Sequence, residues 1–145
     1  MSLLIKALRS GLLALSLATG IVTVSAQLAA AATEVNIVDG YAVHGYDVVA
    51  YFRLGRPVEG LDSYIAEFDG ATYRFSSAEN RDDFVADPAR YAPQYGGYCA
   101  FGTAMGRKFD GDPTAWAIVD GKLYLNLNAD VQARWKTNVP GFVKG

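Results

Sequence analysis

Two pairs of β-rich runs, each broken by an Asp-Gly pair, stand out in the pattern of hydrophobic and polar positions. The breaks are Asp69-Gly70 and Asp120-Gly121. Asp-Gly between such runs is a strong signal for a tight hairpin, because glycine tolerates a positive φ. The pattern therefore predicts two antiparallel hairpins. Their paired runs are 64–68 with 71–75, and 115–119 with 122–127.

A helix is predicted after each hairpin. Ser76 with Glu79 forms a capping box before the first helix, over 78–86. Asn128 can cap the second helix, over 129–137. Both helices are followed by a proline, which is typical of a helix that has already ended.

The two hairpin–helix segments share a spacing. Counted from the Asp of each Asp-Gly pair, a Tyr, a Ser or Asn and a large aromatic fall at identical offsets, and a Pro differs by one. The sequence predicts an α+β domain of two β-hairpin–helix units, with both large aromatics buried in one core. Coincidence between two common patterns is the alternative. The matching residues are Tyr73, Ser77, Phe84 and Pro88 in the first unit, and Tyr124, Asn128, Trp135 and Pro140 in the second.

Two further segments complete the predicted domain. Asp47–Phe52 is rich in Val, Tyr and Phe, which favours an additional N-terminal strand. The segment 91–111 has five glycines and no clear period, which indicates a structured loop between the units. We expect Tyr91, Tyr95 and Tyr98 to bury their rings against this loop with their hydroxyls paired. A ligand pocket lined by these phenols is the alternative.

Residues 1–32 have the pattern of a secretory signal peptide. Lys6 and Arg9 precede an apolar stretch, Gly11–Val24, which ends in small residues suited to cleavage. We expect the mature N-terminus between Gln27 and Thr33, a single domain over 33–145, and a periplasmic or secreted location. An uncleaved anchor is the alternative; after cleavage we expect no membrane insertion.

Charge and cysteine content narrow the possible partners. The chain has a net charge of −2, and the leader holds two of its 13 basic residues and none of its 15 acidic ones. An acidic domain without a basic cluster lacks the usual footprint of a nucleic-acid or anionic-lipid partner. A single cysteine also excludes an internal disulfide.

The candidate chemistry rests on few side chains, since the domain after the leader holds one His, one Cys and one Met. His44-x-x-Asp47 can place an imidazole near a carboxylate. Cys99 and Met105 are ligands suited to a soft ion such as Cu(I). We therefore take Cys99, His44, Asp47 and Met105 as the candidate metal ligands. In the alternative interpretation, Asp47 caps or braces a loop, His44 donates to a backbone carbonyl, and Cys99 is a buried packing residue.

An enzymatic role is less favoured. A Cys99–His44 dyad oriented by Asp47 would be an activated-nucleophile arrangement. The chain shows no cysteine-hydrolase signature and no phosphate-binding glycine loop. We therefore assign no catalytic residues.

Several motifs resemble the YHS domain family. They are Gly45–Phe52, Phe68–Ser77 with Phe84, Asp87-Pro88 and Tyr91, and the run Tyr95–Ala100. With these motifs in order, 38–142 is similar to secreted bacterial YHS-domain proteins. YHS domains occur near the metal-handling parts of copper- and heavy-metal-transporting ATPases, so the resemblance implies a metal-associated domain. The cysteines of the metal-associated forms are missing here, at Val48–Phe52 and at Phe75-Ser76-Ser77.

The expectation is therefore an exported YHS-type binding module for a soft metal ion, with copper as the candidate cofactor. The alternative is a metal-free interaction domain that docks a periplasmic or membrane protein. A Cys/His thiol enzyme is the third hypothesis.

Overall fold

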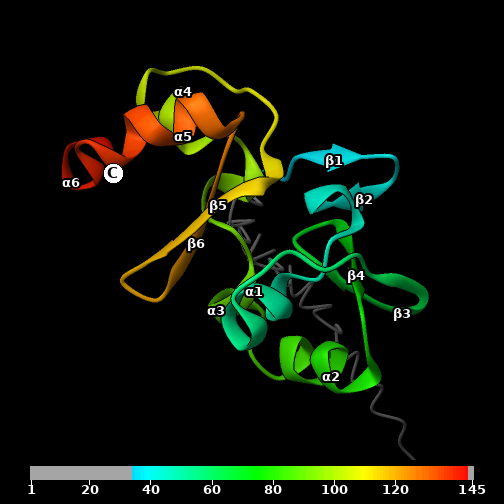
Figure 1. The fold of residues 1–145 in the computed structure, drawn as a ribbon. Coiled ribbons are helices and arrows are strands. Elements are labelled where there is room, and N and C mark those ends of the chain that lie inside the picture. The colour runs from blue at the N-terminus through cyan, green and yellow to red at the C-terminus, as the bar shows by residue number, and fades with distance from the viewer. Residues whose placement is uncertain (1–33, 144–145) are drawn as a thin grey trace, which may run out of the picture.

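The computed structural model describes residues 34–143 of the chain, and the predicted signal peptide lies outside this range. The described part is a small α+β domain of antiparallel hairpins and short helices (Figure 1). No helix between residues 34 and 143 is long and apolar enough to cross a membrane.

The first hairpin has the predicted turn. Strands β3 (Leu61–Phe68) and β4 (Ala71–Phe75) pair antiparallel, with Phe68 opposite Ala71 across the Asp69-Gly70 turn. Both turn residues have positive φ, 49° and 76°, as this kind of turn requires. Helices α2 (Ala78–Ala86) and α3 (Pro88–Tyr91) follow.

The second hairpin repeats the first. Strands β5 (Asp112–Val119) and β6 (Lys122–Asn126) pair across Asp120-Gly121, and helices α5 (Ala129–Lys136) and α6 (Val139–Phe142) follow. Each hairpin also has a register shift in its first strand, three residues after Leu61 in β3 and three residues after Asp112 in β5. The hairpins and the helices after them confirm the predicted pattern.

The repeat extends further back than the sequence pattern indicated. Before each hairpin lies a turn, η1 (Val43–Gly45) or η2 (Gln94–Gly97), and then a short helix, α1 (Val48–Leu54) or α4 (Ala100–Ala104). Three consecutive residues in each turn have positive φ. The residue before each short helix is also held alike: Asp47 N donates to Val58 O at 2.8 Å, and Cys99 N donates to Phe109 O at 2.9 Å. The segment 91–111 is thus the start of the second unit.

The prediction of a strand over Asp47–Phe52 is wrong, because this segment forms helix α1. The Asp47 side chain accepts hydrogen bonds from Val49 N and Ala50 N and so caps the helix, and Gly55 ends it in the left-handed region. Val48–Tyr51 are all buried, so no polar position interrupts the run and its period was not visible in the sequence. The additional N-terminal strands are β1 (Ile37–Val38) and β2 (Tyr41–Ala42).

The capping box at Ser76 is also wrong by one residue. Ser77 caps α2 and accepts a hydrogen bond from Asn80 N at 3.1 Å. The Ser76 hydroxyl instead donates to the Asp47 carboxylate at 2.6 Å, and Glu79 accepts from Arg53 at 2.7 Å. Asn128 caps α5 as predicted.

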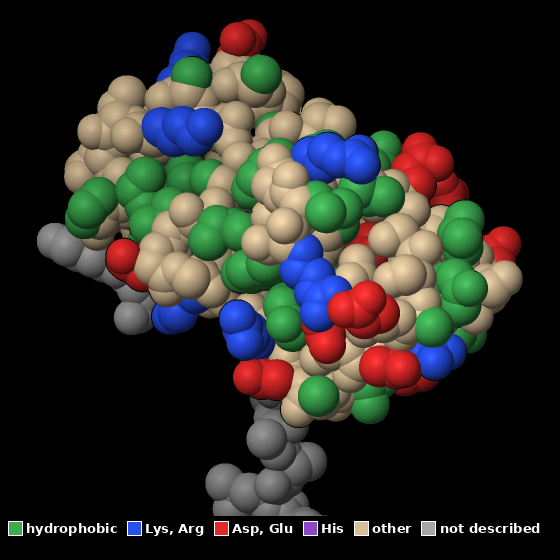
Figure 2. Space-filling model, turned by 60° about the horizontal axis from the view of Figure 1, so that its bottom comes forward, with side chains coloured by type: hydrophobic (Ala, Val, Ile, Leu, Met, Phe, Trp, Pro, Cys, Tyr) green, Lys and Arg blue, Asp and Glu red, His purple; other side chains and the backbone are tan. Residues whose placement is uncertain are grey.

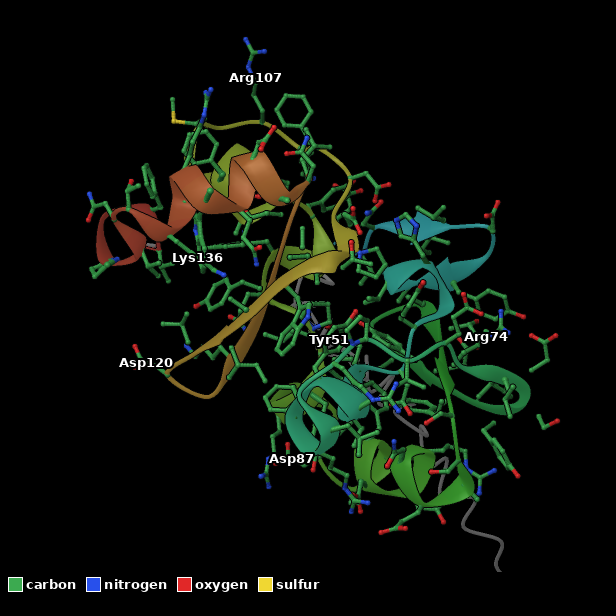
Figure 3. All side chains as sticks on the ribbon, in the orientation of Figure 1. Tyr51, Arg74, Asp87, Arg107, Asp120 and Lys136 are labelled. Carbon is green, nitrogen blue, oxygen red and sulfur yellow. The ribbon has the colours of Figure 1, made fainter. Side chains whose placement is uncertain are left out.

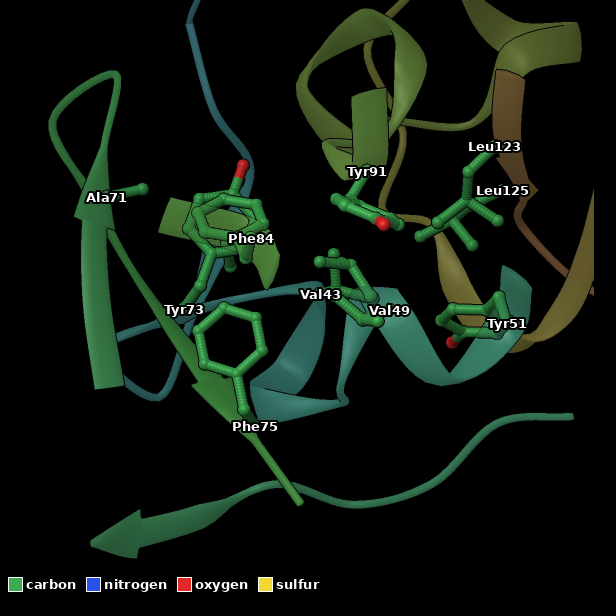
Figure 4. Packing of buried hydrophobic residues seen from close by; sticks show 12 residues of the cluster. Val43, Val49, Tyr51, Ala71, Tyr73, Phe75, Phe84, Tyr91, Leu123 and Leu125 are labelled. Carbon is green, nitrogen blue, oxygen red and sulfur yellow. The ribbon is translucent and has the colours of Figure 1, made fainter. Parts of the chain in front are cut away.

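Phe84 and Trp135 are both fully buried, as predicted, but they lie in two different apolar clusters. Phe84 stacks on Tyr73, with ring centroids 4.8 Å apart, and Trp135 packs on Tyr124 at 5.2 Å. The first cluster also contains Leu123 and Leu125 of β6, and Figure 4 shows them beside Tyr91. The second hairpin thereby contributes to the core of the first unit.

On the surface, basic and acidic side chains lie interspersed on the face that Figure 2 displays. Ion pairs such as Arg53–Asp83 and Arg81–Asp82 connect residues of α1 and α2 there or nearby. Because no single sign of charge dominates this face, the hollows of the molecule are better guides to a site.

Candidate functional site

The carboxylate of Asp47 is fully buried and its oxygens are engaged in structural hydrogen bonds. Besides the two backbone N–H groups of α1, it accepts from Ser76 N at 2.8 Å, from the Ser76 hydroxyl, and from Asn80 Nδ2 at 2.7 Å. This network joins the start of α1 to the start of α2. The position of Asp47 agrees with the alternative interpretation of a capping residue.

Cys99 occupies the position in the second unit that Asp47 occupies in the first. Its thiol is buried, accepts from Gly102 N at 3.4 Å and lies 3.8 Å from Asn126 Oδ1. The Cys99 sulfur therefore caps α4 much as the Asp47 carboxylate caps α1. No contact with His44 supports the thiol-enzyme hypothesis, because the His44 ring is engaged elsewhere.

The four predicted metal ligands lie in different surroundings. Met105 ends α4 and is 62 % exposed, whereas Asp47 and Cys99 are buried at two separate helix starts. Within residues 34–143, no three His, Cys, Asp or Glu side chains are grouped so that they could hold a metal ion. The described geometry thus does not bring His44, Asp47 and Cys99 together.

His44 lies instead against an acidic residue of the second unit. It is part of the η1 turn, where Val43, His44 and Gly45 all have positive φ. This conformation is unusual for a β-branched residue such as Val43, and such strain persists only where the surroundings enforce it. The turn places His44 Nε2 2.8 Å from Asp110 Oδ1.

The His44–Asp110 pair lies in a hollow of about 400 Å³, here called the histidine hollow. Its polar lining includes Tyr46, Asp112 and Thr114. Asp112 accepts from both the N–H and the hydroxyl of Thr114 at 2.7 Å. The complete lining is His44, Tyr46, Asp110, Asp112, Pro113, Thr114 and Leu127.

Negative charge dominates the histidine hollow. Tyr46 donates to Glu59 at 3.5 Å, and its pKa is raised above the ordinary value by burial and by the charges of Glu59 and Asp112. With Asp110 included, three carboxylates surround one imidazole and one phenol. This arrangement favours a cation over an anion.

The chain that follows the predicted leader is attached beside this hollow. Asn36 Nδ2 donates to Asp110 Oδ1 at 2.5 Å, and Asn36 N donates to Gly96 O at 2.9 Å. Glu34 accepts from Tyr98 at 3.1 Å and forms an ion pair with Lys108. The paired hydroxyl of Tyr98 agrees with the expectation for the tyrosines of the glycine-rich segment.

Sequence reasoning identified His44 but missed Asp110. The two residues are 66 positions apart, in different units. Only the repeat gave a signal, because Asp110 directly precedes the second hairpin, as Glu59 nearly precedes the first. No spacing rule connects a turn in one unit to a loop in the other.

No family model, curated protein or solved structure matches this chain.

Proposed function

We propose that the protein is an exported YHS-type binding domain that holds a divalent transition-metal ion, such as Cu(II), between His44 and Asp110. The observation that supports this proposal is the 2.8 Å contact between His44 Nε2 and Asp110 Oδ1 at the histidine hollow. The side chains of His44 and Asp110 are 28 % and 47 % exposed, so an ion from solution can reach them.

The donor set favours a borderline divalent ion over the soft Cu(I) of the sequence-based expectation. Imidazole nitrogen suits Cu(II) and Zn(II), whereas thiolate and thioether ligands select Cu(I). Cys99 and Met105, the two sulfur residues of the described chain, are not part of the histidine hollow. Cys99 and Met105 are therefore not ligands in this proposal, and neither is Asp47.

Two protein ligands imply an exchangeable ion. Water would complete the coordination shell, and the nearby Asp112 and Glu59 would add to the attraction by charge alone. Such a site suits a domain that captures and releases metal rather than one that needs metal to fold.

The proposal predicts a Cu²⁺ titration that the single imidazole reports directly. The chain holds one histidine, so the imidazole signals in an NMR spectrum of untagged protein belong to His44. Paramagnetic Cu²⁺ at substoichiometric amounts should broaden these signals and the amide signals of Asp110 and Asp112 first. Isothermal calorimetry should give one ion per chain.

Variants separate this site from the one expected from the sequence. His44→Ala should abolish binding, and Asp110→Asn should weaken it about ten- to a hundredfold, as removal of one anchoring carboxylate does. Cys99→Ser is the matched control and should bind Cu²⁺ like wild type. If His44→Ala also binds like wild type, the proposed site is wrong and the metal-free interaction domain becomes the better interpretation.

A further inference from the structure

The internal repeat creates two matching hollows outside the histidine hollow. The first-unit hollow, of about 230 Å³, is lined by Phe68, Asp69 and Tyr73 of the β3–β4 hairpin and by the chain that follows α2. The second-unit hollow, of about 210 Å³, is lined by Val119, Asp120 and Tyr124 at the same hairpin positions and by α6. Figure 3 shows Asp120 at the tip of the β5–β6 hairpin.

Each hollow contains the same polar pair, an exposed turn aspartate and a buried tyrosine. Tyr73 is 1 % and Tyr124 is 3 % exposed. Burial raises the pKa of both phenols, and the charge of Asp69 on Tyr73, and those of Tyr95 and Asp120 on Tyr124, raise it further. The aspartates are therefore electrostatically coupled to the phenols that share their hollows.

The two phenols are unpartnered within the described residues. Other tyrosines of the domain do donate, Tyr51 to Pro113 O at 2.8 Å and Tyr98 to Glu34. Neither Tyr73 nor Tyr124 has such a bond to a residue between 34 and 143. In Figure 4 the hydroxyl oxygen of Tyr73 projects beyond its ring stack with Phe84.

A buried hydroxyl without a partner costs free energy, and phenylalanine would fill the same space without that cost. The same unpartnered phenol nevertheless occurs in both units, each time in a hollow beside a carboxylate. A polar partner from outside the chain would satisfy the phenol, and a cationic donor would satisfy both groups.

We propose that the two hollows are a duplicated binding site for small alkylammonium ions. The ammonium group donates one hydrogen bond to the aspartate and one to the phenol oxygen, and the alkyl chain lies against the apolar wall. This inference is independent of the metal site, because the hollows share no lining residue with the histidine hollow.

The two sites should differ in affinity because their walls differ. The first-unit hollow has the aromatic rings of Phe68 and Tyr95, whereas the second has Val119, Val139, Pro140 and Val143. A cation near an aromatic face is attracted by the ring, and aliphatic side chains offer no such term. We therefore expect the first-unit hollow to fill first.

The probe is n-butylammonium chloride, titrated into ¹⁵N-labelled protein and followed by amide chemical shifts. Shifts should appear around Asp69 and Tyr73 at lower concentration than around Asp120 and Tyr124. Neutral n-butanol at the same concentrations is the control for apolar contact and should bind at least tenfold more weakly. Absence of shifts at both hollows up to the solubility of the protein in the titrant would overturn the proposal.

Tyr73→Phe and Asp69→Asn test the polar pair. Each should weaken binding at the first-unit hollow by about tenfold, the effect of losing one hydrogen bond to a charged group. Binding at the second-unit hollow should not change, and Tyr124→Phe should give the converse result. If Tyr73→Phe binds the probe like wild type, the phenol does not contact the ligand and the proposal fails.

A readout of stability separates a ligand site from a purely structural phenol. Because the Tyr73 hydroxyl is unpartnered, Tyr73→Phe should unfold at the same denaturant concentration as wild type or at a higher one. A clear loss of stability would show that the hydroxyl has a structural partner, and it would contradict the proposal.

Discussion

Replacing Asp47 with Ala should lower the free energy of unfolding by about 3–5 kcal/mol. The substitution removes the cap of α1, which is typically worth about 1 kcal/mol. It also leaves Ser76 N and Asn80 Nδ2 without the acceptor that they now have at 2.8 and 2.7 Å. Each buried donor left unpaired costs about 1–3 kcal/mol. Urea denaturation followed by tryptophan fluorescence measures the difference.

Ser77→Ala is the matched control for this prediction, because it removes the cap of α2 and no buried network. It should cost only about 1 kcal/mol. Equal losses for Asp47→Ala and Ser77→Ala would mean that Asp47 acts as an ordinary helix cap and that its contacts to Ser76 and Asn80 contribute little.

Phe84→Ala and Trp135→Ala should each lower the free energy of unfolding by about 3–5 kcal/mol, the usual range for a buried large aromatic. Both side chains are fully buried, Phe84 against Tyr73 and Phe75, and Trp135 against Tyr124. Equilibrium denaturation of both variants, monitored by circular dichroism, tests the prediction. Val85→Ala is the control, because Val85 is 60 % exposed and should change stability by about 0.5 kcal/mol or less.

The same experiment tests whether the two apolar clusters unfold together. Leu123 and Leu125 extend from the second hairpin into the first cluster, so we expect a single transition in both variants. Two separated transitions, one sensitive to Phe84 and the other to Trp135, would show that each hairpin–helix unit unfolds independently.

The sequence predicted the hairpins and the helices after them because those features are local. An Asp-Gly turn, a cap such as Asn128 and a following proline act within a few residues, and their effect does not depend on the rest of the fold. Spacing alone also predicted that Phe84 and Trp135 are buried. The first helix was mistaken for a strand because Val48–Tyr51 are buried on every side, so tertiary packing erased the period that identifies a helix.

The sites depended on contacts that no local rule contains. Asp47 appeared able to bind a metal, but folding brings Ser76 and Asn80 to it from the second helix of the same unit, and they occupy its oxygens. His44 found its partner 66 residues away in Asp110. The unpaired phenols of Tyr73 and Tyr124 became visible only when the hollows around them were known.

The sequence by itself determined the α+β class, the two repeated units and the scarcity of His, Cys and Met side chains, because these follow from composition and from interactions between near neighbours. The tertiary structure alone decided which side chains share a site. A site is formed by groups that are distant in sequence, and their approach depends on how the two units pack and on the left-handed turn at Val43–Gly45.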